Sequence, residues 1–283
     1  MEKLMLGVIG DPIAHTLSPL IQNAIAEKLG ILAEYGVYHV PLADLPDFVD
    51  MAKKTLRGFN ITIPHKQNIL PYLAEIDDYA AGCGAVNTVR IKDGKLHGYN
   101  TDGDGLRMAM AMNDIRMENN RILMLGAGGA ARSICRKALE LGSSVTVLCR
   151  NPEKADDFRT FGASVGQMTT KNISRHAETA GIIINATPLG MEGIREDFTD
   201  LSFLDRTKAA VVDIVYKPAE TTLLKGCRER DLTCMNGLGM LVCQAVYAFA
   251  IFSEAEFDLE AMAGHVMDVV SKVIYGKTNH KEN

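Results

Sequence analysis

The chain lacks the basic excess that polyanion-binding proteins carry. Its 283 residues include 30 lysines and arginines against 35 aspartates and glutamates, which gives a formal net charge of −5 at pH 7. Because nucleic-acid-binding surfaces need such an excess, this balance argues against nucleic acid as a partner. A small anionic ligand needs only a local site, so the charge balance leaves that class of partner open.

Motifs that bind metals or exchange disulfides are also missing. The six cysteines are scattered, and no two have the C-x-x-C spacing of zinc ribbons and thioredoxin-type proteins. Cysteines spread in this way are typical of small core residues in a reducing cytoplasm. The seven histidines form no H-E-x-x-H motif, so we predict no metal and interpret His15 and His65 as packing or hydrogen-bonding neighbours.

Long hydrophobic runs are missing as well. The apolar run near the N-terminus is too short for a signal peptide. The 22 residues of Leu232–Ser253 carry no charge, but Asn-Gly-Leu-Gly at 236–239 should break a helix there. The remainder, Met240–Phe252, has about 13 residues and is too short to span a bilayer. We therefore expect a buried helix, no membrane partner and a cytoplasmic location.

What the sequence does contain is a regular alternation of short apolar runs and helical patterns. Its length predicts about two domains. In the first part, helical patterns follow Ser18-Pro19, Leu45-Pro46 and His65. Four strands are expected at Leu4–Ile9, Tyr35–Val40, Gly58–Ile63 and Ala85–Ile91. This alternation predicts an α/β layer built from βαβ units.

A second α/β unit begins near Asn119. We expect one helix at Ser133–Leu141 and strands at Arg121–Leu125, Ser144–Cys149, Ile182–Asn185 and Ala210–Val215. The last forty residues have helical patterns and could pack back on the first unit.

A glycine-rich turn follows the first strand of the second unit. Gly126-Ala-Gly-Gly-Ala-Ala131 matches G-x-G-x-x-G/A and lies between a strand and a helix, with another strand about 20 residues on. Gly126 permits the turn, and Gly128 lets the backbone approach a pyrophosphate at the start of the helix. The alternative is a βα turn that binds no ligand, but the complete unit favours a dinucleotide site.

The end of the next strand indicates which dinucleotide. It closes with Arg150, and Asn151 and Lys154 follow. NAD sites usually place Asp or Glu here to hold the ribose 2′-hydroxyl, whereas a guanidinium suits a 2′-phosphate. The pattern therefore favours NADP over NAD; the alternative is that Arg150 is a solvated strand end.

A nicotinamide enzyme also needs a group that exchanges a proton. No tyrosine here has a lysine four residues later, which disfavours the Tyr-x-x-x-Lys class, and Lys66 is the candidate instead. The segment before it predicts a strand with Asn60 and Thr62 on one face and Ile61 and Ile63 on the other. Lys66 then falls in the first turn of a helix, where the positive dipole end favours the neutral amine and suits proton exchange. The alternative is a solvated surface lysine.

Asp102 follows a second polar segment, Tyr99-Asn-Thr. It could cap a helix that begins near Gly105, as Asp104 could, or it could orient Lys66 and the reacting hydroxyl.

Two hydroxyls lie close together near the N-terminus, on Thr16 and Ser18. Ser18 before Pro19 suits a helix N-cap with proline at the first helical position. A helix start with spare hydroxyls also suits a carboxylate ligand.

Taken together, these segments resemble the shikimate dehydrogenase family nearly from end to end. The matching segments are GVIGDPIAHTLSP (7–19), NITIPHK (60–66), GAVNT (84–88), YNTD (99–102), GAGGAAR (126–132), NATPLGM (185–191), DIVYKPAETTLL (213–224) and NGLGMLVCQA (236–245). Their order, spacing and residue types agree across both parts of the chain.

The resemblance implies a fold of two open α/β domains. Residues 1–103 and 238–283 would form a substrate-binding and catalytic domain, and 104–237 a Rossmann-type NADP-binding domain. The C-terminal helices would pack back on the first domain.

It also implies roles for individual residues. Lys66 and Asp102 would form the catalytic pair. Contacts to the substrate would come from Thr16, Ser18, Asn60, Thr62, Asn87, Tyr216 and Gln244. Contacts to the cofactor would come from Gly126, Ala127, Gly128, Gly129, Ala130, Arg150, Asn151, Lys154, Thr187, Ile214 and Gly237.

The implied activity is the NADP-dependent, reversible reduction of 3-dehydroshikimate to shikimate, by a monomer or homodimer.

The chain departs from the family pattern at two places. One is Thr16, where the family usually has serine; the other is Cys149-Arg150-Asn151, where the family often has Asn-Arg-Thr. The alternatives are a quinate/shikimate dehydrogenase that uses NAD or NADP, and a non-catalytic shikimate or cofactor sensor. Retention of both Lys66 and Asp102 argues against the sensor.

Overall fold

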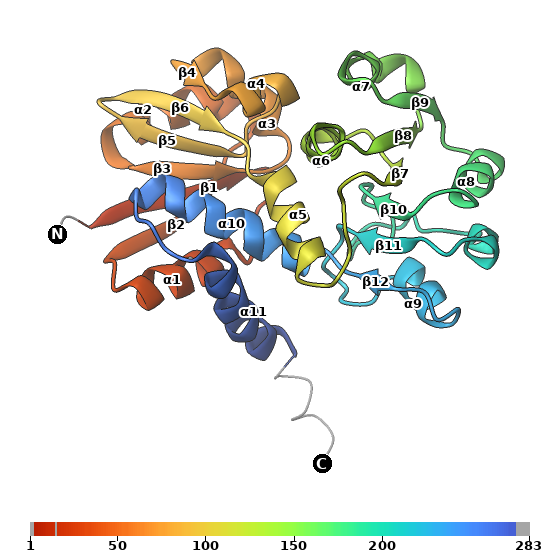
Figure 1. Cartoon of the computed structure of the whole chain (residues 1–283). Helices are drawn as coiled ribbons and strands as arrows, with labels where there is room; N and C mark the ends of the chain where they lie inside the picture. Colours follow the sequence, from red (N-terminus) through yellow and green to blue (C-terminus); the bar gives the residue numbers. More distant parts are fainter. Residues whose placement is uncertain (1–2, 15, 276–283) are drawn as a thin grey trace. The chain divides into compact units, whose positions relative to one another are not determined.

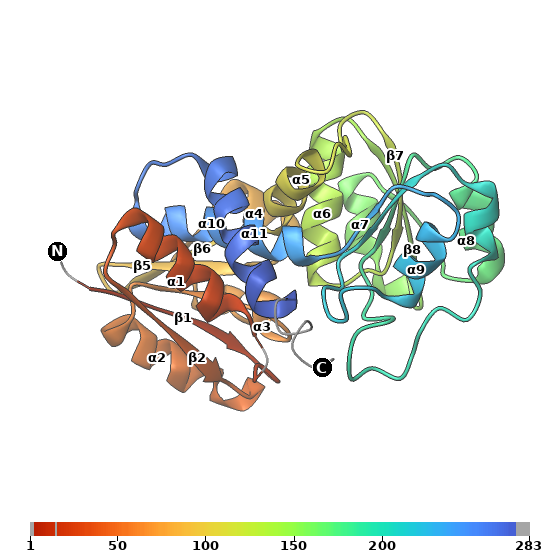
Figure 2. The same ribbon diagram turned by 90° about the horizontal axis from the view of Figure 1, so that it is seen from below.

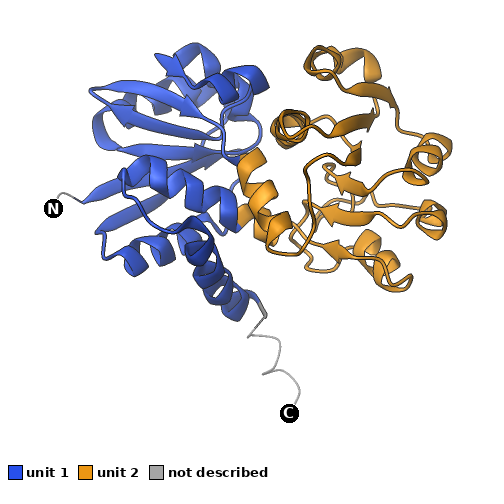
Figure 3. Ribbon diagram, viewed as in Figure 1, with its two compact units in different colours: residues 1–101, 242–283 blue, residues 102–241 orange. Residues whose placement is uncertain are grey.

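The computed structural model describes residues 3–14 and 16–275, and the chain forms two compact units (Figures 1 and 3). Unit 1 comprises residues 1–101 and 242–283, and unit 2 comprises residues 102–241. Each unit contains one six-stranded sheet. The chain thus has two separate α/β layers, as the sequence predicted.

The sheet of unit 1 is mixed. Its strands are β1 (Leu4–Gly10), β2 (Ala33–His39), β3 (Gly58–Ile61), β4 (Glu75–Ile76), β5 (Thr88–Lys92) and β6 (Lys95–Tyr99), in the order β2-β1-β3-β5-β6-β4. β1 is parallel to β2 and β3, but β5 is antiparallel to both β3 and β6.

The expectation of βαβ units is therefore wrong for the second half of this sheet. Asp93 and Gly94 have φ values of 51° and 70° and join β5 to β6 directly. A two-residue turn with both residues at positive φ is the typical connection of an antiparallel hairpin. The Asp-Gly pair was the signal in the sequence that indicated it.

Helices cover both faces of this sheet. They are α1 (Ser18–Leu29), α2 (Leu45–Thr55), α3 (His65–Asn68), α4 (Asp78–Cys83), most of α10 (Leu238–Ser253), and α11 (Leu259–Tyr275). Figure 2 shows α2 on one side of the strands and α1, α10 and α11 on the other. On the α2 side, Phe48 packs edge-on against Phe59 of β3, with ring centroids 5.1 Å apart.

The C-terminal helices pack on unit 1, which confirms that expectation. A Cβ placed on Gly58 of β3 would lie 2.5 Å from the ring of Phe252 in α10, so only glycine allows this close approach. Just after α10, the Glu254 carboxylate pairs with Arg90 of β5 at 2.5 Å. α11 packs in turn against α1.

The sheet of unit 2 is parallel throughout. Its strands are β7 (Arg121–Leu125), β8 (Ser144–Cys149), β9 (Ser164–Gln167), β10 (Ile182–Asn185), β11 (Ala210–Asp213) and β12 (Cys234–Met235), in the order β12-β11-β10-β7-β8-β9. This is the doubly wound order of dinucleotide-binding folds. The helices are α5 (Asp102–Ala111), α6 (Gly129–Glu140), α7 (Asp156–Phe161), α8 (Thr170–Ala177) and α9 (Thr222–Arg228).

Most of the expected elements of unit 2 are confirmed. β7, β8 and β10 have the expected bounds, and β11 ends two residues early. α6 begins at Gly129, four residues before the expected Ser133, because the glycine turn ends at Gly128. The short strands β9 and β12 were not predicted.

The uncharged C-terminal stretch forms the expected helix, α10. The expectation that Asn-Gly-Leu-Gly at 236–239 would break a helix is only half right, because the last two of these residues lie inside α10. α10 begins at Leu238 and includes Gly239. The Asn236 side chain accepts a hydrogen bond from the Leu238 N–H and so starts the helix. Across residues 3–14 and 16–275, no helix combines the length and apolar character needed to cross a membrane.

Candidate active site

The glycine turn lies at the point of the parallel sheet where the strand order reverses, between β7 and β10. Gly126 has a φ of 105°, and a Cβ there would lie 2.8 Å from the Ala186 carbonyl oxygen and 2.9 Å from the Thr187 methyl carbon. The Ala186 N–H also donates to the Leu125 carbonyl at 2.8 Å. Ligands of open α/β sheets bind at this switch point, where Gly126 and Thr187 lie together.

The start of α6 fits a pyrophosphate. Gly128 occupies the N-cap position, no side chain caps the helix, and a Cβ on Gly128 would meet nothing within 4 Å. The first N–H groups of a helix have no intrahelical partner, and the helix dipole favours an anion there. Gly129 and Ala130 begin the helix and Ala127 precedes it. The backbone of this turn therefore has the donor set and the open space that a dinucleotide needs.

Arg150, Asn151 and Lys154 follow β8 on an exposed segment. The Gln167 side chain donates to the Arg150 carbonyl at 2.8 Å, and the Lys154 N–H donates to the Asn151 carbonyl at 3.0 Å. The Arg150 side chain is 72% exposed, and its Nη1 lies 3.5 Å from Glu196 Oε2. Two cationic side chains are thus present where the sequence predicted the 2′-phosphate contact.

Ile214 and Gly237 approach each other beyond the ends of β11 and β12. A Cβ on Gly237 would lie 1.9 Å from the Ile214 carbonyl oxygen, so no other residue fits here without a shift of the backbone. The cofactor residues that the resemblance implied all follow the same, carboxyl-terminal edge of the parallel sheet.

A buried network behind this edge was not predicted. Asp213 is fully buried and accepts hydrogen bonds from Asn185 Nδ2 at 2.9 Å and from Thr221 Oγ1 at 2.7 Å. Asn185 Oδ1 in turn accepts from the Thr187 hydroxyl at 2.6 Å. Burial raises the pKa of Asp213, while these hydrogen bonds oppose the rise. The network fixes the loops that carry Thr187 and Ile214. The polar residues that close the buried strands β10 and β11 were the signal for it.

In unit 1, most of the predicted substrate residues lie in one chain of hydrogen bonds. The Thr16 hydroxyl donates to Ser18 Oγ at 3.0 Å and accepts from the Ser18 N–H at 3.2 Å. The Ser18 side chain is hydrogen-bonded to Tyr35, whose hydroxyl donates to Asn60 Oδ1 at 2.7 Å. Burial raises the pKa of Tyr35 well above its ordinary value, so this phenol stays protonated and acts as a donor. The chain therefore links the N-terminal hydroxyls to β3.

The same network continues to the C-terminal part of the unit. Asn60 Nδ2 donates to Thr88 Oγ1 at 3.1 Å, and the Thr88 hydroxyl donates to Asn87 Oδ1 at 2.9 Å. Asn87 Nδ2 donates to the Thr101 hydroxyl at 3.0 Å and to Gln244 Oε1 at 3.3 Å. Residues far apart in the sequence thus converge, and five of the seven predicted substrate residues are connected.

Tyr35, Thr88 and Thr101 were missed as members of this network, as was Gln22, which donates to Asn60 Oδ1 at 3.3 Å. The sequence marks Tyr35 only as a residue of an expected strand, and Thr101 only as part of the polar segment before Asp102. Their role depends on contacts between distant strands, which local patterns do not show.

Ser18 does not cap α1, contrary to expectation. The helix begins at Ser18 itself, with Leu17 in the capping position and no side-chain cap. The Thr16 side chain satisfies the Ser18 N–H instead.

The expected alternation along residues 60–63 is also only half right. β3 ends at Ile61, which is buried, whereas Ile63 is 72% exposed. The chain turns here, with the His65 N–H donating to the Thr62 carbonyl at 2.9 Å. As far as the described residues show, half-buried Thr62 stands outside the hydrogen-bonded network, and its methyl carbon faces Gly10.

Lys66 lies in the first turn of α3, as predicted, but α3 has only four residues. The dipole of so short a helix is small, so the start of α3 does not by itself single out Lys66 for proton exchange. The Lys66 carbonyl accepts from the N–H of Val86, the residue before Asn87, at 2.8 Å, and this hydrogen bond fixes the lysine backbone next to Asn87.

His65 is fully buried and its Nε2 donates to the Val40 carbonyl at 2.6 Å, as expected of a hydrogen-bonding neighbour. His15 lies outside the described residues.

Asp102 follows Thr101 and is the first residue of α5, which begins three residues before the expected start at Gly105. Asp102 is buried, and neither it nor Asp104 precedes the helix as a cap. Asp104 Oδ1 instead pairs with Lys137 Nζ of α6 at 2.9 Å. An acid in the first turn is stabilised by the helix dipole.

Tyr216, the remaining predicted substrate residue, lies in unit 2 and is half-buried. Burial raises the pKa of its hydroxyl, with Lys217 opposing the rise, so the phenol is neutral and can donate a hydrogen bond.

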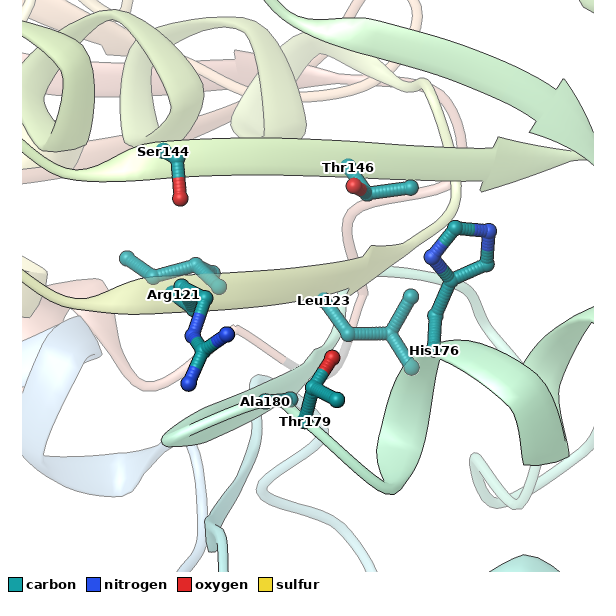
Figure 4. A pocket seen from close by; sticks show the side chains of 8 residues that line it. Arg121, Leu123, Ser144, Thr146, His176, Thr179 and Ala180 are labelled. Atoms are coloured by element: carbon teal, nitrogen blue, oxygen red, sulfur yellow. The ribbon is translucent and has the colours of Figure 1, made fainter.

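Unit 2 also has a shallow pocket at the opposite edge of its sheet (Figure 4). Its volume is about 60 Å³, and it is lined by Arg121, Ile122, Leu123, Ser144, Thr146, His176, Thr179 and Ala180. Arg121 and Ser144 begin β7 and β8, so this pocket is at the edge away from the glycine turn. It has room for a few water molecules and is smaller than the pockets of about 300–1,000 Å³ that hold small ligands. Among the described residues, no cluster of three or more His, Cys, Asp or Glu side chains could hold a metal ion.

The doubly wound sheet, the glycine turn at its switch point and the arginine after β8 are features of the Rossmann class of dinucleotide-binding proteins, and this chain has a second α/β unit besides. Comparison with known proteins gives the particular family. Residues 8–89 match the family model described as the shikimate dehydrogenase substrate binding domain. The chain belongs to the shikimate dehydrogenase family.

Three relatives support this assignment. The shikimate dehydrogenase (NADP(+)) of Nitrosopumilus maritimus is 39% identical over 262 residues, covering 90% of this chain and 95% of the relative. That of Methanocaldococcus jannaschii is 36% identical over 292 residues, covering 95% and 98%. The crystal structure of shikimate 5-dehydrogenase from Thermus thermophilus in complex with NADP(H) and shikimate has a TM-score of 0.84 at 31% identity, covering 94% of this chain and 99% of that one.

Proposed function

We propose that this protein is an NADP-dependent shikimate dehydrogenase that reversibly reduces 3-dehydroshikimate to shikimate. It would act in the cytoplasm, as a monomer or homodimer, in the pathway to chorismate and the aromatic amino acids. The observation that carries the proposal is the hydrogen-bonded chain from Thr16 to Gln244. In a member of this family, that chain unites five of the residues to which the resemblance gives substrate contacts.

We further propose that the two functions are divided between the two parts of the chain. Residues 1–103 and 238–283 would bind substrate and hold the catalytic pair, and residues 104–237 would bind NADP. The match of residues 8–89 to a substrate binding domain supports the first assignment. The parallel sheet with its glycine turn supports the second.

In the proposed reaction, Lys66 donates a proton from Nζ to the carbonyl oxygen of 3-dehydroshikimate, and Asp102 orients the lysine and the reacting oxygen. When bound, the nicotinamide of NADPH supplies the hydride to the carbonyl carbon. The hydride and the proton together convert the ketone to the secondary alcohol. In the reverse direction Lys66 takes the proton from the alcohol.

The hydroxyls of Thr16 and Ser18 would bind the substrate carboxylate, because hydroxyl donors at a helix start suit an anion. Asn60, Thr62, Asn87, Tyr216 and Gln244 would contact the ring. Asn60, Asn87 and Gln244 belong to the hydrogen-bonded network and are suited to a ring that bears several hydroxyls, because their side chains are already oriented before the substrate binds.

Initial rates with shikimate and with quinate, each against NADP and NAD, test the proposal. We expect the highest kcat/KM for shikimate with NADP. Faster turnover of quinate with NAD would favour the quinate/shikimate alternative instead. Binding of shikimate and NADP without turnover would identify a sensor.

A further inference from the structure

The loop between β10 and β11 brings an acidic side chain to Arg150, the residue to which the proposed function gives the contact with the cofactor 2′-phosphate. Glu196 Oε2 lies 3.5 Å from Arg150 Nη1. The chain at Glu196 is anchored by its own carbonyl, which accepts from the Gly190 N–H at 3.2 Å, and by the side chain of the next residue, Asp197, which accepts from the Thr222 hydroxyl at 2.5 Å. These two contacts keep the Glu196 backbone near Arg150.

This ion pair does little for the fold. Both side chains are largely exposed, Arg150 to 72% and Glu196 to 66%, and exposed pairs add little to stability. Its charge matters more for a ligand, because Arg150 is the side chain that suits the 2′-phosphate of NADP. A phosphate monoester carries a charge of about −1.5 to −2 at pH 7. The 2′-phosphate and the Glu196 carboxylate would therefore both pair with the Arg150 guanidinium.

We propose that Glu196 is a specificity-determining residue whose carboxylate competes with the cofactor 2′-phosphate for Arg150 and so reduces the preference for NADP over NAD. NAD has a hydroxyl at this position, and its binding does not need to displace Glu196. A carboxylate beside the 2′-position is, moreover, the feature by which many dinucleotide sites accept NAD. The inference rests on the proposed function, since it assumes that Arg150 faces the cofactor.

The variant Glu196→Gln removes the charge and keeps the size of the side chain. Dissociation constants for NADPH and NADH, measured by calorimetry without substrate, give a readout independent of turnover. We expect NADPH to bind about fivefold more tightly, the scale of one exposed charge pair, and NADH to change by less than about twofold.

A matched control lies on the same loop. Glu192 pairs with Lys217 at 3.1 Å instead of Arg150, so Glu192→Gln changes the net charge equally and should leave the ratio of the two constants unchanged. In an Arg150→Gln background, the gain from Glu196→Gln should disappear, because there is no guanidinium left to release.

Three results would overturn the proposal: an equal change for both cofactors in Glu196→Gln, an equal gain in Glu192→Gln, or a gain that persists without Arg150. These three results can be told apart from results that would contradict the proposed function. If the unmodified protein did not bind NADPH or did not oxidise shikimate, the function would fail; if it did both and Glu196→Gln left the ratio unchanged, only this inference would fail.

Discussion

The candidate sites of the two units are built from different parts of the chain. In unit 1 the candidate site consists of side chains, joined by hydrogen bonds from Thr16 through Tyr35 and Asn60 to Asn87 and Gln244. In unit 2 it consists mainly of backbone at the glycine turn, together with exposed cations after β8. A polar ring needs several donors and acceptors in fixed directions, whereas phosphates need N–H groups and positive charge. Substitutions should therefore act through hydrogen bonds in unit 1 and through shape and charge in unit 2.

The largest effect is expected for Lys66→Ala in unit 1. Loss of a general acid–base group lowers kcat by about a hundredfold or more, with a much smaller change in KM. Initial rates of shikimate oxidation measure this. Lys54→Ala, which alters an exposed lysine at the end of α2, is the matched control and should retain full activity. Near-normal kcat in Lys66→Ala would remove Lys66 from the mechanism.

In unit 2 the corresponding test is Arg150→Asp. Loss of a charge-assisted hydrogen bond and the new repulsion should weaken NADP by about a hundredfold, and NAD only slightly, because NAD lacks the 2′-phosphate. Equilibrium binding of both cofactors measures the effect. Arg175→Asp, on the exposed surface of α8, applies the same charge reversal elsewhere and should change neither constant. Equal losses for both cofactors in Arg150→Asp would make Arg150 a folding residue.

Thr16→Val returns to unit 1 and removes one hydroxyl while it keeps the shape. A hydrogen bond to a charged group is worth about 1.5–3 kcal/mol, so kcat/KM for shikimate should fall by about ten- to a hundredfold. The Thr16 hydroxyl also accepts from the Ser18 N–H, so the melting temperature is measured in parallel. Thr55→Val removes an exposed hydroxyl that bonds the Met51 carbonyl and is the control. Unchanged kinetics would leave Ser18 as the carboxylate contact.

Two glycines separate backbone geometry from cofactor binding in unit 2. Gly128→Ala adds a Cβ that meets no protein atom within 4 Å, so stability should change little while NADPH binds about tenfold more weakly, because the methyl group occupies the space that a pyrophosphate needs. Gly126→Ala places a Cβ 2.8 Å from the Ala186 carbonyl at a φ of 105°, so it should lower the melting temperature itself. Binding and melting curves of both variants test this. Full NADPH affinity in Gly128→Ala would show that the pyrophosphate does not approach there.

The same division explains what the sequence could predict. The central elements of unit 2 follow from local signals, namely buried strands of the parallel sheet, a glycine turn and a helix, so β7, β8 and β10 have the expected bounds, whereas the short strands β9 and β12 were missed. In unit 1 the antiparallel hairpin of β5 and β6 was missed, although Asp93-Gly94 marks its turn. Local patterns alone indicate Lys66, Arg150 and the glycine turn as candidates, whereas Asn87, Tyr216 and Gln244 come only from the family resemblance. The hydrogen bonds that join these residues, including those made by Tyr35 and Thr101, depend on pairing between distant strands. No local pattern specifies that pairing.

Thr16→Ser is the smallest expected effect, because it removes only a methyl group and keeps the hydroxyl in the network of unit 1. A fully buried methyl contributes at most about 0.8 kcal/mol, so kcat/KM for shikimate should shift by no more than about fourfold. Thr16 is half-buried, which places the effect below that limit. The direction of the change in kcat/KM shows what the methyl group contacts. A gain with quinate would indicate that the methyl crowds the tetrahedral carbon that bears the extra hydroxyl of quinate, and that Thr16 directs the enzyme toward shikimate. If the shikimate-to-quinate ratio stays the same, the methyl does not contact that carbon, and Thr16 acts through its hydroxyl alone.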